Sequence, residues 1–320
     1  PQAIQLMLDP ADCGPATIAM SQDVQGETFD YPEIFFEERI HEVRRVHPDP
    51  RQVKQAAEKL MNSKQPIIIS GGGVLYSEAE EELSIFAKKH NIPVTSTVMG
   101  IGCMTRDDPY YISAVGALGE GSSNSLSKDT DLALAIGTKL ADFTTGSWAN
   151  FENPNFKLVS VNTARFDTTK HLATSVISDA KIGLQQISDA LGDWRAPNTW
   201  YQRAIKERDE WDAYVEKQSG PTNQEEPSYA HAVGAVYRNS DPSDIVVTAA
   251  GGLVGEVVQV WKPKQLNTFE TEWGFSCMGY EISGALGIKM AKPDQDVVVF
   301  VGDGSYLLNN SDIYSSVLYN

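Results

Sequence analysis

An aspartate between two glycines, placed directly after an apolar run, is the feature of the sequence with the clearest chemical potential. The segment VVVFVGDGS covers residues 297–305, and Asp303 stands between Gly302 and Gly304. The apolar run predicts a strand in the middle of a parallel sheet, and such sheets bind ligands at the carboxyl ends of their strands. A carboxylate there can coordinate a hard divalent cation that bridges to phosphate, while glycines let the backbone approach an anion. A plain Asp-Gly turn is the alternative interpretation.

A second segment could hold phosphate groups. In VVTAAGGLVGEVV, residues 246–258, a strand-like run leads into the small residues Ala249, Ala250, Gly251 and Gly252, and a helix-like run follows from Leu253. Small residues leave room for a diphosphate, and the N–H groups of a first helical turn can bind it. Neither GxGxxG nor GKS or GKT occurs, which excludes a dinucleotide fingerprint and a P-loop. A tight turn between strand and helix is the alternative.

A third segment, EWGFSCMGYEISGALG at 272–287, carries a methionine in a predicted strand-to-helix loop. Met278 is bulky and flexible among small polar neighbours, although filling a core is the ordinary role of such a residue. Gly279, Gly284 and Gly287 predict a helix that packs close to a neighbouring backbone.

The elements that must position these motifs alternate between strand-like and helix-like runs. Strands are predicted at 66–73, 93–100, 131–140 and 156–163, and helices at 49–65, 77–92 and 177–192. The first of these helices has Asp49 as its expected N-cap and Pro50 at its first position. Strands separated by helix-length runs predict a parallel sheet with helices on its faces.

The chain divides into five predicted segments. Residues 1–25 have the pattern helix, turn, strand, and 26–48 form a polar, aromatic linker. Residues 49–196 form the first strand–helix unit, 197–228 a charged helical connection, and 229–320 a second strand–helix unit. Because helix-like runs stand at both ends without caps, we expect a piece of a longer protein.

Composition excludes several classes of function. The 320 residues carry a net charge of −17, so nucleic acid and anionic membranes are not expected partners. No apolar run is long enough to span a membrane, and no secretory signal opens the sequence. Cys13, Cys103 and Cys277 are far apart, which predicts three ordinary buried thiols in a reducing cytoplasm.

Taken together, the order and spacing of the three motifs resemble the pyrophosphate-binding domain of thiamine diphosphate enzymes. The resemblance implies thiamine diphosphate and Mg²⁺ as cofactors, with Asp303 as a metal ligand. The family's second metal ligand is an asparagine further along the chain. Asn309, Asn310 and Asn320 come too early for that role, so we expect it after residue 320.

The resemblance also assigns roles to the other motif residues. Met278 corresponds to the side chain that wedges the cofactor into its bent form, and the Ser276 carbonyl to the acceptor for its aminopyrimidine. The remaining cofactor-binding positions implied are Ala250, Gly251, Gly252, Leu253, Gly302, Gly304 and Ser305. No catalytic residue is assigned within the chain, because the family's activating glutamate would precede residue 1.

Upstream segments extend the resemblance. Residues 64–102 resemble the start of the central domain of the acetolactate synthase branch, which is a six-stranded doubly wound sheet. Residues 14–27 resemble the last strand of a pyrimidine-binding domain. The implied fold is α/β, with a doubly wound parallel-sheet central domain flanked by partial pyrimidine-binding and pyrophosphate-binding domains. The GGG at 71–73 is interpreted as a tight turn rather than a nucleotide loop, and FAD is not expected.

Within this branch, residues 14–27, 29–41, 279–297 and 301–307 resemble hydrolases that break the bond between the carbonyl carbons of a cyclic polyol 1,2-dione in inositol catabolism. The alternatives are an acetolactate synthase-like carboligase, a decarboxylase of malonic semialdehyde or a 2-oxoacid, and a non-catalytic nucleotide-binding module. The family resemblance implies a homodimer or homotetramer for the intact protein. By itself this chain is expected to be inactive and to bind thiamine diphosphate weakly.

Overall fold

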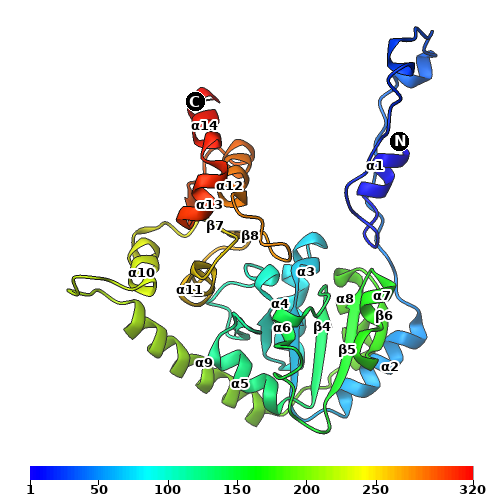
Figure 1. Cartoon of the computed structure of the whole chain (residues 1–320). Coiled ribbons are helices and arrows are strands. Elements are labelled where there is room, and N and C mark those ends of the chain that lie inside the picture. Colours follow the sequence, from blue (N-terminus) through cyan, green and yellow to red (C-terminus); the bar gives the residue numbers. More distant parts are fainter. Residues whose placement is uncertain (320) are drawn as a thin grey trace.

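The computed structural model of the chain, which describes residues 1–319, contains one six-stranded and one three-stranded parallel sheet (Figure 1). The larger sheet has the order β3-β2-β1-β4-β5-β6. Its strands are β1 (Pro66–Ser70), β2 (Val94–Ser96), β3 (Tyr111–Ala114), β4 (Leu132–Ile136), β5 (Lys157–Asn162) and β6 (Thr174–Ile177). The order reverses between β1 and β4, so the predicted doubly wound sheet is confirmed.

Helices cover both faces of this sheet because its strands are apolar on both faces. Along β4, Leu132 and Leu134 share a core with α2 (Pro50–Met61), α4 (Glu80–His90) and α8 (Ala180–Leu191). Ala133 and Ala135 face the other way, toward α5 (Gly121–Asp129) and α9 (Asn198–Ser219). The predicted cap of α2 is confirmed, since Asp49 Oδ1 accepts from Arg51 N at 2.8 Å.

Short helices occupy the loops of the larger sheet. They are α3 (Gly72–Tyr76), α6 (Asp142–Thr145), α7 (Arg165–Thr168), and the 3₁₀ turns η3 (Val98–Gly100) and η4 (Lys170–Leu172). Packing accounts for the glycines before and within α3, because a Cβ on Gly73 would stand 2.6 Å from Gly137 Cα. The GGG segment therefore forms a close connection between β1 and α3, and the absence of a nucleotide there remains a prediction.

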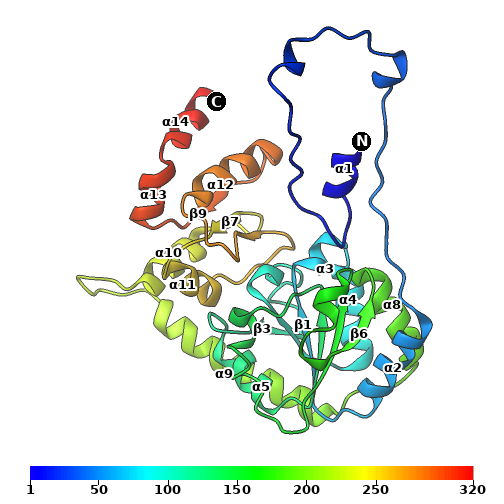
Figure 2. The ribbon, with the colours of Figure 1, turned by 45° about the vertical axis from the view of Figure 1, so that its right-hand side comes forward.

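The N-terminal 48 residues form an extended arm that rises from the central sheet (Figures 1 and 2). It contains α1 (Gln2–Met7) and the 3₁₀ turns η1 (Val24–Gly26) and η2 (Glu33–Phe35). The strand predicted within residues 15–24 is wrong. Among the described residues it has no neighbouring strand, and a lone strand leaves its backbone N–H and C=O groups unpaired. At the base of the arm, Arg45 Nη1 contacts Asp179 Oδ2 at 2.9 Å.

The smaller sheet has the order β8-β7-β9, with β7 (Ile245–Thr248), β8 (Phe269–Thr271) and β9 (Val297–Val299). Its helices are α10 (Tyr229–Asn239), α11 (Leu253–Val260), α12 (Tyr280–Ala291), α13 (Asp303–Asn309) and α14 (Ser311–Tyr319). The prediction that β9 lies in the middle of a sheet is wrong for the described chain. It is an edge strand and half-buried, because only β7 pairs with it.

The two sheets share a core, which includes Val98 and Ala114 from the central unit and Val246 and Val257 from the smaller unit. A buried ion pair joins them as well, since Lys262 Nζ lies 2.6 Å from Glu120 Oε2. The shared core and the ion pair thereby connect the smaller sheet directly to the central sheet. The five segment boundaries derived from the sequence remain a prediction.

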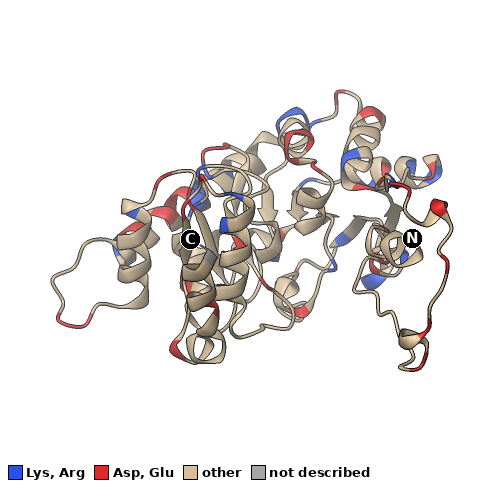
Figure 3. Cartoon of the chain, turned by 90° about the horizontal axis from the view of Figure 1, so that it is seen from above, with Lys and Arg blue, Asp and Glu red and all other residues tan. Residues whose placement is uncertain are grey.

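Charged residues are dispersed over the molecule, with Lys and Arg scattered among Asp and Glu in the view of Figure 3. Within residues 1–319, no helix combines the length and the apolar character needed to cross a membrane. Cys103 is buried as predicted, but Cys13 and Cys277 are exposed, so that prediction is wrong for two of the three thiols. Cys13 lies on the arm and Cys277 in a loop, where neither finds a core.

Candidate functional site

Three loops meet at one edge of the smaller sheet. Val247 of β7 pairs with Glu270 of β8 and with Val299 of β9, and both pairings are parallel. Because parallel strands present their carboxyl ends at the same edge, the loops at 249–252, 272–279 and 300–302 converge. We call them the first, second and third site loops. All residues predicted to contact the cofactor lie in these loops or in the first residues of the helices that follow.

The first site loop leaves open space where its glycines stand. A Cβ added to Gly251 or Gly252 would find no atom within 4 Å, so packing does not require either glycine to lack a side chain. Gly251 has φ +89°, which favours glycine on conformational grounds. Leu253 begins α11, and the N–H groups of a first helical turn have no partners within the helix. This arrangement fits an anionic group such as a diphosphate.

The third site loop presents the predicted metal ligand. Gly302 is the N-cap of α13, and Asp303 is the first residue of that helix with an exposed side chain. Its Oδ1 accepts from the N–H of Gly304 at 2.9 Å, while Ser305 behind it is buried. A Cβ on Gly302 would also meet nothing within 4 Å. The Asp303 carboxylate is therefore accessible at the edge of the sheet where the three site loops meet.

The second site loop brings Met278 against the third. A Cβ built on Gly304 would lie 3.0 Å from Met278 Cε, and the Met278 side chain is otherwise 49% exposed. Met278 is therefore partly open to the site rather than a core residue. Ser276 is exposed and has φ +51°, an uncommon conformation for a residue with a side chain.

Glu272, a residue not among those predicted from the sequence, holds the second loop in this shape. Its Oε1 accepts from Phe275 N at 3.3 Å, and its Oε2 accepts from Cys277 N at 2.6 Å. The two bonded amides flank Ser276, so this carboxylate stabilises the positive φ of that residue. A glutamate just after a predicted strand and before a glycine-rich loop is the only sequence signal for this role.

Glu281 is a second missed residue, and it connects two loops. Its Oε1 accepts from Ala250 N and its Oε2 from Gly279 N, both at 3.1 Å. The side chain is completely buried. The available sequence signal was a glutamate in the first turn of a helix whose next seven residues are all apolar or small.

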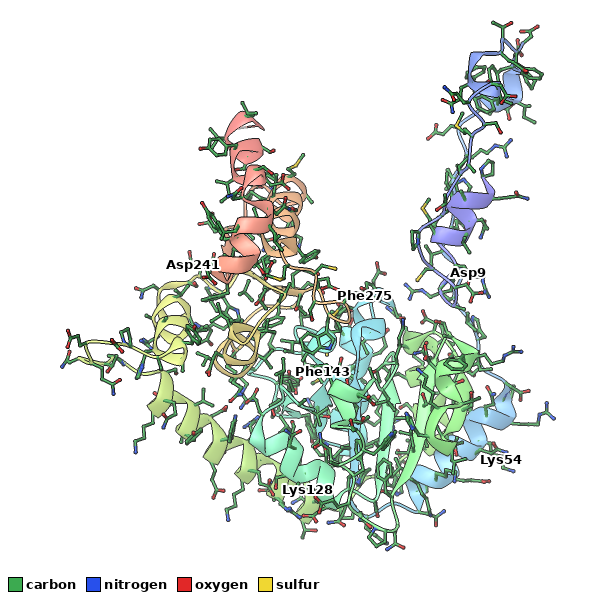
Figure 4. All side chains as sticks on the ribbon, viewed as in Figure 1. Asp9, Lys54, Lys128, Phe143, Asp241 and Phe275 are labelled. Atoms are coloured by element: carbon green, nitrogen blue, oxygen red, sulfur yellow. The ribbon has the colours of Figure 1, made fainter. Side chains whose placement is uncertain are left out.

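The second loop also faces the central sheet. The Trp273 ring packs edge-on against Phe143 of α6 with centroids 5.2 Å apart, and Figure 4 shows Phe275 nearby at the junction of the two units. Tyr280 donates from its hydroxyl to Glu270 Oε1 at 3.2 Å. Burial raises the pKa of Glu270, and burial together with the Glu270 charge raises the pKa of Tyr280 to about 12. This side of the site combines apolar rings with hydrogen-bonding groups.

The described residues fit a diphosphate with a bridging cation better than a metal held by protein alone. Within residues 1–319, no three His, Cys, Asp or Glu side chains converge as a metal cluster. Asn309 does not reach toward Asp303 but donates to the Gly279 carbonyl at 3.4 Å and to Ser283. Asn320 lies outside the described residues. Asp303 is an exposed carboxylate beside the open position of Gly302, so it would leave the remaining coordination sites of a hard cation to phosphate oxygens and water.

Comparisons with known proteins agree with this geometry. The family model described as "Thiamine pyrophosphate enzyme, central domain" matches residues 53–187. The model described as "Thiamine pyrophosphate enzyme, C-terminal TPP binding domain" matches residues 249–320. These ranges contain the doubly wound sheet and all three site loops, respectively.

Several curated proteins named 3D-(3,5/4)-trihydroxycyclohexane-1,2-dione hydrolase are similar to the chain. The one from Clostridium tetani is 37% identical over 98% of the chain and 53% of its own length. That from Geobacillus thermodenitrificans is 35% identical over 98% of the chain and 52% of its own length. That from Bacillus licheniformis is 36% identical over 100% of the chain and 54% of its own length. The chain thus spans about half the length of these relatives.

Proposed function

The chain belongs to the thiamine pyrophosphate enzymes, and from this premise we propose that it forms part of a hydrolase that opens the ring of a trihydroxycyclohexane-1,2-dione. The observation that carries the proposal is the agreement among relatives, which bear this name and match 98% or more of the chain. Ring opening between the two carbonyl carbons would yield 5-deoxyglucuronate, a step of myo-inositol catabolism. The reaction belongs to the hydrolases of carbon–carbon bonds.

In this proposal the first and third site loops bind the cofactor's diphosphate. Ala250, Gly251, Gly252 and Leu253 provide open backbone and helix N–H groups, and Gly302, Gly304 and Ser305 shape the backbone around Asp303. Asp303 would hold Mg²⁺, which neutralises phosphate charge and fixes the diphosphate in place. When bound, thiamine diphosphate supplies the carbanion that attacks a carbonyl and the electron sink for breaking the adjacent bond.

The second site loop would set the shape of the cofactor. Met278 lies half-exposed over Gly304 and would press against the bent cofactor between its two rings. The carbonyl of Ser276 would accept a hydrogen bond from the aminopyrimidine, and Glu272 keeps that carbonyl in place through the amides on either side. These residues orient the cofactor and do not themselves transfer protons.

The rest of the machinery would come from outside this chain. The relatives are about twice as long, which supports an activating glutamate and a second metal ligand in the parts of the intact protein that flank residues 1–320. We therefore propose that the chain alone is inactive, that the intact protein is a homodimer or homotetramer, and that it works in the cytoplasm. Three free cysteines are compatible with that reducing compartment.

The proposal is tested by supplying the dione to the full-length protein that contains this chain, with thiamine diphosphate and Mg²⁺. We expect release of the ring-opened acid, detected by chromatography and mass spectrometry. Pyruvate and malonic semialdehyde serve as comparison substrates for the carboligase and decarboxylase alternatives. Turnover of either one at a higher kcat/KM than that of the dione would refute the assigned substrate.

A further inference from the structure

Glu281 is the residue that physically joins the first and second site loops. One of its carboxylate oxygens accepts from Ala250 N and the other from Gly279 N, each at 3.1 Å. Ala250 precedes the open glycines of the first loop, and Gly279 directly follows Met278. Among the hydrogen bonds of the described residues, these two form the only side-chain bridge between the loops.

The surroundings of this carboxylate indicate a specific role. Its side chain has no exposure to solvent, and within residues 1–319 it forms no ion pair with Lys, Arg or His. Burying a carboxylate without a cation is unfavourable unless its oxygens accept hydrogen bonds. The two amides and the N-terminal end of α12, where Glu281 stands in the first turn, provide that compensation. An apolar residue would cost less at a purely structural position, so the link between the amides is what this residue contributes.

We propose that Glu281 is a positioning residue that fixes the spacing between the diphosphate-binding loop and the loop that holds the thiamine rings. This inference rests on the proposed function, because it assumes that the two loops engage opposite ends of one cofactor. A rigid bridge would then let a molecule bound at its diphosphate find Met278 and the Ser276 carbonyl already in place. Glu272 differs from Glu281 because both of its bonds lie within the second loop.

The substitution Glu281→Gln separates this role from general stability. Glutamine has the same shape, but its amide group has a single acceptor oxygen, so one of the two bonded amides would face an NH₂ donor. The bridge would be lost while the volume of the buried side chain is kept. The substitution also removes a negative charge near the diphosphate loop.

The test compares two ligands on the full-length protein in the presence of Mg²⁺, with affinities measured by titration calorimetry. In the proposed site, inorganic pyrophosphate contacts only the first and third loops. Thiamine diphosphate contacts all three loops, so its binding depends on the spacing between the first and the second. In Glu281→Gln we expect the affinity for pyrophosphate to change much less than that for thiamine diphosphate, because pyrophosphate does not require a fixed spacing between the first and second loops. Thiamine diphosphate should bind roughly 10- to 100-fold more weakly, as expected for a buried donor left unpaired.

Glu120→Gln is the matched control, since Glu120 is equally buried but paired with Lys262 away from the three loops. It should lower thermal stability while the ratio of the two affinities stays at the parental value. If Glu281→Gln changes both affinities by the same factor, or neither, the positioning role is wrong. If Glu281→Gln does not fold, Glu281→Asp replaces it, because aspartate keeps the charge but is too short to reach both amides. The ratio of the affinities for pyrophosphate and thiamine diphosphate is then the readout.

Amide hydrogen exchange distinguishes failure of this inference from failure of the proposed function. In Glu281→Gln, segments 247–258 and 273–284 should exchange faster than in the parent, with no ligand present. If exchange is unchanged in both segments, Glu281 does not couple the two loops, whatever the measured affinity for thiamine diphosphate. A parent protein that does not bind thiamine diphosphate would instead overturn the proposed function, and the exchange data would still decide whether Glu281 couples the loops.

Discussion

The side chain of Met278 lies against the backbone of Gly304, with Met278 Cε 3.0 Å from the position that a Cβ on residue 304 would occupy. The glycine after Asp303 therefore makes room for the methionine of another loop. This contact connects the proposed wedge with the proposed metal ligand, and it places both at one edge of the smaller sheet.

Met278→Ala should reduce turnover more than cofactor affinity. The diphosphate anchor lies in other loops, whereas the truncated side chain would no longer restrict the cofactor's conformation. We expect kcat to fall roughly tenfold or more, which corresponds to about 1.4 kcal/mol in the activation barrier, with the Kd for thiamine diphosphate changing less. Met290→Ala, at an exposed position of α12, is the control. A kcat equal to that of the parent would show that Met278 has no part in orienting the cofactor.

Gly251→Ala should destabilise the protein although it fills empty space. The φ of +89° disfavours any residue with a Cβ, and the expected loss is about 1–2 kcal/mol in the free energy of unfolding. Gly287→Ala is the matched substitution, because its Cβ would also meet nothing but its backbone is helical. That variant should gain about 0.5–1 kcal/mol. Urea unfolding of both variants is the measurement, and equal effects would contradict the role assigned to φ.

Most of the central sheet could be predicted from the sequence because its strands are short apolar runs between amphipathic helices. The pattern alone missed β3 and β6, since Tyr111–Ala114 and Thr174–Ile177 mix polar and apolar residues. Their burial is decided by the neighbouring strands. The strand expected within residues 15–24 and the central position of β9 were wrong for a related reason: pairing depends on strands that the described chain does not provide.

The candidate site was predictable where residue type and local turn geometry coincide. Asp303 and Gly251 are examples, since their positions at strand ends follow from the apolar runs before them. Glu272 and Glu281 were not predictable, because each acts through backbone amides that only the folded loops bring to it. The prediction that the glycines of α12 let this helix pack close to a neighbouring backbone was wrong for Gly284 and Gly287. Gly287 faces open space instead of a neighbouring backbone, and a Cβ on Gly284 would meet the Tyr280 ring of the same helix.

Lys262→Met should destabilise the contact between the two sheets. Lys262 and Glu120 are buried together, and burial lowers the pKa of Lys262 and raises that of Glu120. Removing the cation leaves a buried carboxylate without its partner, at a cost of about 3–5 kcal/mol in the free energy of unfolding. Lys289→Met, which breaks a largely exposed pair with Asp296, should cost less than about 1 kcal/mol.

The double variant Lys262→Met with Glu120→Gln provides the internal check on this pair. It removes both charges, so it should recover a large part of the stability lost in Lys262→Met. Denaturant unfolding gives all of these values. No recovery in the double variant would mean that the loss comes from packing of the lysine stem and not from the unpaired carboxylate.

His90 should make stability fall in mild acid. Its ring is buried and bonded to the Trp194 carbonyl at 2.8 Å and to Ser188 Oγ at 2.9 Å, and burial lowers its pKa from the ordinary value of 6.5. The unfolded chain therefore takes up a proton at a higher pH than the folded protein does. The stability contributed by neutral His90 is fully present above about pH 6.5 and is lost as the pH falls below that value.

This pH dependence is checked by urea unfolding at several pH values between about 5 and 7.5, the range in which histidine titrates. In His90→Gln the decline toward acid should be shallower, by up to about 1.4 kcal/mol per pH unit for one proton. His47→Gln, at an exposed position of the arm, should keep the parental slope. If His90→Gln declines as steeply as the parent, His90 is not the group responsible.

The most direct test of the cofactor site is a titration of the full-length protein with thiamine diphosphate, with and without Mg²⁺, in the parent and in Asp303→Asn. The parent should bind saturably, and Mg²⁺ should strengthen binding because Asp303 and the diphosphate share the cation. In Asp303→Asn we expect affinity roughly 10- to 100-fold lower and largely independent of Mg²⁺, a loss of about 1.4–2.7 kcal/mol. Asp296→Asn, an exposed aspartate before β9, should behave like the parent. Parental affinity and parental Mg²⁺ dependence in Asp303→Asn would contradict a metal-binding role for this carboxylate.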